Sequence, residues 1–137
     1  MSKLSSFLKK NIELLVGNYN LNQNLFLPFD KKIIDFFDEL SKTILSKKFK
    51  ENPEITSFGF WCRKNNLLNY FHEFNSKNLR VGRGISFHIT PSNVPINFAF
   101  SFVFGLLTGN CNIVRVPSKT FIQVEIILRI IKNSLLY

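Results

Sequence analysis

Cysteine and histidine are scarce in this sequence, which has two of each among its 137 residues. Cys62 and Cys111 do not form a C-x-x-C pair, and two histidines leave a structural metal without a complete ligand set, so we expect no metal site. A disulfide between the two cysteines stays open. A lysine-rich chain with two cysteines and no recognisable secretion signal is more typical of the reducing cytoplasm, where we expect this protein.

Acidic residues and long apolar runs are also in short supply. Lysine and arginine outnumber aspartate and glutamate by 18 to 9, and the net charge of +9 permits nucleic acid, anionic lipid or a phosphorylated cofactor as partner without selecting one. The most apolar segment, residues 94–108, is shorter than the ~20 residues of a transmembrane helix and contains Asn97. Residues 1–15 alternate charged and apolar side chains too closely for a signal peptide. We therefore expect a buried helix over 94–108 and no membrane span.

Hydrophobic side chains, in contrast, are plentiful. They make up 45% of the residues and include 16 phenylalanines. A disordered chain has too few of them to offset its conformational entropy, so we expect a packed core here. The length suits one domain or a piece of a larger one.

The first 80 residues carry apolar side chains at helical spacing. Helical spacing runs from residue 1 to about residue 19, and we expect a helix there that Gly17 can end. We expect a second helix that begins at an Asp30 N-cap. A third should begin at Pro53 and be interrupted near residues 64–66 before its pattern resumes. The apolar positions of the second helix are Ile33, Ile34, Phe37, Leu40 and Ile44, and those of the third segment are Ile55, Phe58, Trp61, Cys62, Leu67, Leu68, Phe71 and Phe74.

Residues 81–137 alternate strand and helix patterns instead. A strand-like run over 85–90 is followed by the apolar helix, a Gly109-Asn110 turn, a short second strand and a final helix from 120 to about 136. This order is a β-α-β unit, and continuous apolar runs are typical of a parallel sheet with both faces buried. We therefore predict an α/β fold, with a helical region over 1–80 and the first β-α-β-α of a Rossmann-like parallel sheet over 81–137.

Polar residues follow both predicted strands. Pro91-Ser92-Asn93-Val94-Pro95 comes after the first strand, and Arg115-Val116-Pro117-Ser118 ends the second. Ligands of parallel sheets bind at the carboxyl ends of the strands, so Asn93 and Arg115 should lie at one edge. The glycine-rich dinucleotide fingerprint is missing, and the residues by themselves indicate a phosphate or nucleotide site without naming the ligand.

The segment GISFHITPSNVPINFAFSFVFGLLTGNCNIVRVPS, residues 84–118, resembles the cofactor-binding entry of the aldehyde dehydrogenase superfamily. HITPSNVP and GLLTGNCNIVRVPS are most similar to the long-chain acyl-CoA reductase family of bacterial bioluminescence. NPEITSFGFWCRKNNL is similar to a helical segment ahead of that family's nucleotide domain. The resemblance covers residues 53–131, and it implies an oxidoreductase that reduces a fatty acyl thioester to the aldehyde with NADPH, through a cysteine acyl-enzyme.

The resemblance also implies roles for single residues. Asn93 matches the asparagine whose side-chain amide helps to form the oxyanion hole, and Thr90, Pro91 and Ser92 match strand-end residues along the cofactor. Arg115 matches a lysine that holds the adenine ribose. Ser118 stands where members that prefer NAD often carry a glutamate. Because a serine donates to a 2′-phosphate that a carboxylate would repel, and a guanidinium suits phosphate, we expect NADPH as cofactor.

The nucleophilic cysteine of the superfamily lies downstream of this region, and neither Cys62 nor Cys111 matches it. We therefore expect an N-terminal fragment, inactive alone, of a longer enzyme that acts on fatty acyl-CoA or another acyl thioester, with a homo-oligomer or an acyl-transferring protein as partner and no nucleic acid. Two alternatives stay open. One is a truncated, catalytically inactive nucleotide-binding or interaction module, and the other is a small basic protein that binds polyanions or membrane surfaces.

Overall fold

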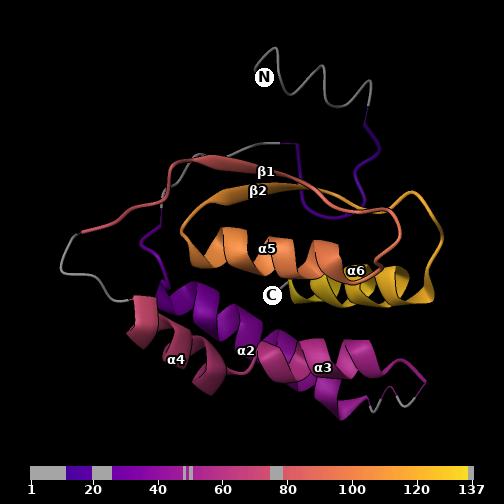
Figure 1. The fold of residues 1–137 in the computed structure, drawn as a ribbon, viewed down its shortest axis with the longest axis horizontal. Coiled ribbons are helices and arrows are strands. Elements are labelled where there is room, and N and C mark those ends of the chain that lie inside the picture. Colours follow the sequence, from indigo (N-terminus) through magenta and orange to yellow (C-terminus); the bar gives the residue numbers. More distant parts are fainter. Residues whose placement is uncertain (1–11, 20–25, 48, 50, 75–78, 136–137) are drawn as a thin grey trace.

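The computed structural model describes residues 12–19, 26–47, 49, 51–74 and 79–135. They form three layers: a two-stranded sheet, then α5 and α6 on one face of it, and then α2, α3 and α4 (Figure 1). In chain order the elements are α2 (Lys31–Ser46), α3 (Pro53–Trp61), α4 (Lys64–Phe74), β1 (Ile85–Ile89), α5 (Asn97–Leu107), β2 (Cys111–Arg115) and α6 (Ile122–Ser134). Among these helices, none combines the length and the hydropathy that a bilayer crossing needs.

The predicted β-α-β unit is confirmed. β1 and β2 pair in parallel, from Ile85 opposite Cys111 to Ile89 opposite Arg115, and α5 makes the crossover between them. Gly109 ends the crossover at φ +83°, a conformation that glycine adopts without strain. The side-chain oxygen of Asn110 accepts hydrogen bonds from the backbone N–H groups of Arg83, over 2.6 Å, and Gly84, over 3.2 Å. The Gly-Asn turn therefore also holds the chain that enters β1.

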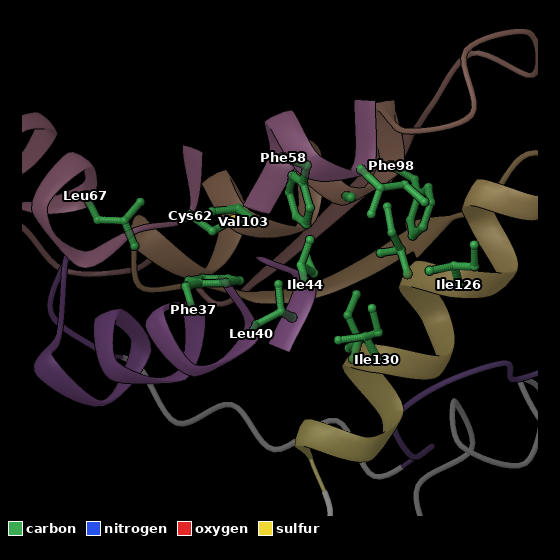
Figure 2. Packing of buried hydrophobic residues seen from close by; sticks show 14 of the residues in the cluster. Phe37, Leu40, Ile44, Phe58, Cys62, Leu67, Phe98, Val103, Ile126 and Ile130 are labelled. Carbon is green, nitrogen blue, oxygen red and sulfur yellow. The ribbon is translucent and has the colours of Figure 1, made fainter. Parts of the chain in front are cut away.

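One hydrophobic core joins the helical region to the β-α-β unit. Phe37 and Phe58, from α2 and α3, are completely buried, and Phe98 and Val103 of α5 lie in the same cluster (Figure 2). α6 adds Ile127, which is also completely buried. The core is continuous across residue 80, and the division predicted there stays a prediction.

Local signals placed the starts of α2 and α3 correctly. Asp30 is the N-cap of α2, and its carboxylate accepts a hydrogen bond from the backbone N–H of Lys32 over 2.8 Å. Pro53 is the first residue of α3, where its missing N–H costs nothing. The break in the third segment comes at Cys62 and Arg63, just before the predicted 64–66, because α4 already begins at Lys64.

Two expectations were wrong. Residues 12–19, the described part of the predicted first helix, contain no helix; residues 1–11 lie outside the described residues. A short isolated helix is marginal unless its apolar face packs, and only Val16 of the described part packs against the core. The sheet is not buried on both faces, because the described helices cover one face and leave Phe87 and Ile89 of β1 61% and 69% exposed.

Two carboxylates of α2 hold the start of α4. The backbone N–H of Lys64 donates to Asp38 over 3.0 Å, and the ammonium group of Lys64 contacts Asp35 over 2.9 Å. Hydrogen bonds from Lys31 and then from Lys64 lower the pKa of Asp35 from its ordinary 3.8 to about 2. Lys42 lowers the pKa of Asp38 in the same way. Asp38 thus caps α4 from a neighbouring helix. Its negative charge near the N-terminus of α4 also interacts favourably with the helix dipole.

This contact predicts a pH-dependent stability. Both pKa values lie below their unfolded values, so the fold favours the ionised carboxylates. Their contribution to the free energy of unfolding is complete above pH 3.8. The contribution of Asp35 is lost as the pH falls towards 2. The Asp35→Asn, Asp38→Asn double variant should therefore be less stable than the unsubstituted chain at neutral pH, and the difference should shrink at low pH. Thermal unfolding from pH 7 to pH 2 measures this, and a difference that stays constant would contradict it. Glu73→Gln, at an exposed position of α4, is the control.

Candidate active site

The carboxyl ends of β1 and β2 lie side by side, because the register pairs Ile89 with Arg115. The turn after β1 exposes Pro91, Ser92 and Asn93, and Arg115 at the end of β2 is exposed as well. The crossover therefore brings Asn93 and Arg115, separated by 22 positions in the chain numbering, to the same edge of the sheet. Their roles in catalysis and cofactor binding stay predictions.

Thr90 differs from the turn residues that follow it. Its side chain is buried, and its hydroxyl donates to the backbone carbonyl of Arg115 over 2.8 Å. The Thr90 hydroxyl thus links the ends of the two strands by a hydrogen bond. Ser118, three residues after β2, is exposed like Arg115.

An open cleft of about 750 Å³ lies along β2. Residues 12–19, β2 with the residues that follow it, and α6 form its walls, and Arg115 and Ser118 line it, whereas residues 90–93 do not. Most of the lining side chains are apolar, and Arg115 and Glu13 are the charged ones. The size and the apolar lining of the cleft suit a small organic ligand, and among the described lining residues Arg115 supplies the one cationic group and Glu13 a carboxylate.

Neither cysteine is placed as a nucleophile. Cys62 is completely buried in the core, and burial raises the pKa of its thiol, which disfavours the reactive thiolate. Cys111 begins β2 at the opposite end of the strand from Arg115. Neither cysteine is bonded to the other, so the disulfide that the sequence left open is not formed.

A polar pair between the sheet and α5 was missed at the sequence level. His88 Nε2 lies 3.0 Å from the side-chain oxygen of Asn112, and the amide of Asn112 donates to the carbonyl of Phe102 in α5 over 3.2 Å. Strand alternation puts His88 and Asn112 on the same face once the register is known. Nothing in the sequence reports that register, which is why His88 had no predicted partner.

Comparison with models of known protein families matches residues 62–134 to the family described as acyl-CoA reductase (LuxC). The matched residues cover more than half of the chain and include α4, β1, α5, β2 and α6. No curated protein and no solved structure matches the chain.

Proposed function

The chain belongs to the acyl-CoA reductase (LuxC) family, and we propose that its β-α-β unit binds NADPH for the reduction of a fatty acyl thioester to an aldehyde. The observation that carries the proposal is the position of Arg115 and Ser118 on the wall of the cleft at the carboxyl end of β2. Ligands of parallel sheets bind at this edge. The proposed location is the cytoplasm, and the two cysteines that form no disulfide support it.

The residues present fit this cofactor. The guanidinium of Arg115 and the hydroxyl of Ser118 are both exposed donors, and the segment from Arg115 to Ser118 contains no carboxylate that would repel a 2′-phosphate, although Glu13 contributes a carboxylate elsewhere in the cleft lining. NADPH, when bound, supplies the hydride. The side-chain amide of Asn93 is proposed to donate to the acyl oxygen when that oxygen becomes negatively charged, and its exposed position on the turn leaves the amide accessible for this role.

The acyl-enzyme step needs a reactive thiolate that these residues do not supply, since Cys62 is buried and Cys111 lies at the far end of β2. The 137-residue chain is therefore expected to bind NADPH without reducing an acyl thioester. Measurable reduction by this chain would contradict this part of the proposal.

Arg115→Ala should weaken NADPH binding about 10- to 100-fold, because a hydrogen bond to a charged group is worth about 1.5–3 kcal/mol. NADH, which lacks the 2′-phosphate, should lose much less affinity. Fluorescence titration of the chain with both nucleotides measures this, and Arg129→Ala is the matched control, since it removes the same charge from an exposed position of α6 outside the cleft. Unchanged NADPH affinity in Arg115→Ala would overturn the assignment of Arg115.

A further inference from the structure

The hydroxyl of Thr90 makes a cross-strand hydrogen bond at the proposed cofactor edge, one residue beyond the last register position of β1. Thr90 follows β1 directly and precedes Pro91, and a residue before proline favours extended backbone. Its side chain is 8% exposed, and Ser41 and Thr90 are the buried polar side chains among the described residues. The strand register ends at the pair of Ile89 and Arg115, and each strand is followed by its own turn.

The acceptor of this hydrogen bond is the carbonyl of Arg115, over 2.8 Å. That carbonyl and the guanidinium side chain share one Cα, so the backbone conformation at Arg115 sets the direction in which the side chain leaves the sheet. A hydrogen bond from the neighbouring strand restrains that backbone where β2 ends. A site of this kind depends on the groups that support its contact residues as well as on the contact residues themselves.

We propose that Thr90 is a positioning residue, which orients Arg115 toward the 2′-phosphate through the Arg115 carbonyl and makes no hydroxyl contact with the cofactor. This inference rests on the proposed function and deepens it. It differs from the role that the family resemblance implies for Thr90, namely a position along the cofactor. The consequence is a selective effect: the substitution of Thr90 should alter the discrimination between NADPH and NADH, because Arg115 is the group proposed to read the phosphate that distinguishes them.

The test compares Thr90→Val, which keeps the side-chain shape but removes the hydroxyl, with Thr90→Ser, which keeps the hydroxyl. Thr108→Val is the matched control, because the Thr108 hydroxyl also donates to backbone carbonyls, those of Phe104 and Gly105, at the opposite edge of the sheet. Dissociation constants for NADPH and NADH are measured on the 137-residue chain. We expect Thr90→Val to bind NADPH about 5- to 10-fold more weakly. This loss of affinity is smaller than the loss expected for Arg115→Ala, because the guanidinium is still present. Its NADH affinity, and both affinities of Thr90→Ser and Thr108→Val, should change less than about twofold.

Two results would overturn the inference alone: an unchanged NADPH affinity in Thr90→Val, or an equal loss for both nucleotides, which a general loosening of the fold would produce. If Thr90→Val shows no cooperative unfolding transition, Thr90→Cys, whose thiol is a weak donor, takes its place under the same criteria. Failure of the unsubstituted chain to bind NADPH would overturn the proposed function, and this inference with it.

Discussion

Phe58→Ala is expected to lower the free energy of unfolding by about 3–5 kcal/mol, the usual cost of removing a completely buried phenylalanine. The Phe58 ring is 0% exposed and meets the ring of Phe100 edge-on, with their centroids 5.1 Å apart. That contact joins α3 to α5, so the resulting cavity would open between the helical layer and the β-α-β unit. Because a domain is stable by only about 5–15 kcal/mol, the variant should lie close to its unfolding threshold.

Phe60→Ala is the matched control for this prediction. Phe60 belongs to the same helix but is 44% exposed, and its ring carries the guanidinium of Arg63 at 4.1 Å. Loss of that contact should cost less than about 1 kcal/mol. Urea unfolding of both variants and the unsubstituted chain measures the two effects. Equal losses in the two variants would show that the layers do not share the core described above.

Gly105→Ala is expected to destabilise the chain by about 2–4 kcal/mol, although alanine favours a helix by about 1 kcal/mol over glycine. Gly105 lies in α5 against β2, and a Cβ there would lie 1.9 Å from the side-chain oxygen of Asn112. The Asn112 side chain cannot turn aside without cost, because it contacts His88 and donates to the carbonyl of Phe102. The close approach of helix and strand therefore depends on the missing side chain.

A double-mutant cycle tests the cause of this effect. Asn112→Ala alone should cost about 1–2 kcal/mol, because it removes the hydrogen bonds between the sheet and α5. Once the Asn112 side chain is gone, adding Gly105→Ala should cost little or even stabilise the helix. If the two substitutions were additive, the overlap with Asn112 would not be the reason for the loss.

The features that could be predicted from the sequence are mostly local. The Asp30 cap, the proline at the start of α3 and the positive φ of Gly109 each involve residues a few positions apart, and their local geometry favours one conformation. The apolar face of α2 was predicted from its spacing for the same reason, and the strand–helix–strand order of residues 85–115 led to the parallel pairing. For the site, the turn at Asn93 and the strand end at Arg115 were predicted as neighbours.

Other features required contacts between residues far apart in the chain. The hydroxyl of Thr90 reaches Arg115, 25 residues away, and the Asp38 carboxylate caps α4 across 26 residues. Neither contact has a sequence pattern, because each depends on the strand register or on the angle at which two helices pack. The cleft likewise exists only where residues 12–19 approach β2 and α6.

The residues of this chain by themselves determined the element types after residue 30, the β-α-β order and the edge at which Asn93 and Arg115 lie, because periodicity, caps and turns act over a few residues. Tertiary structure alone decided that residues 12–19 form no helix, that one face of the sheet stays exposed and that Thr90 is tied to Arg115. A short helix gains most of its stability from packing, and a buried hydroxyl takes its partner from whichever backbone the fold brings beside it.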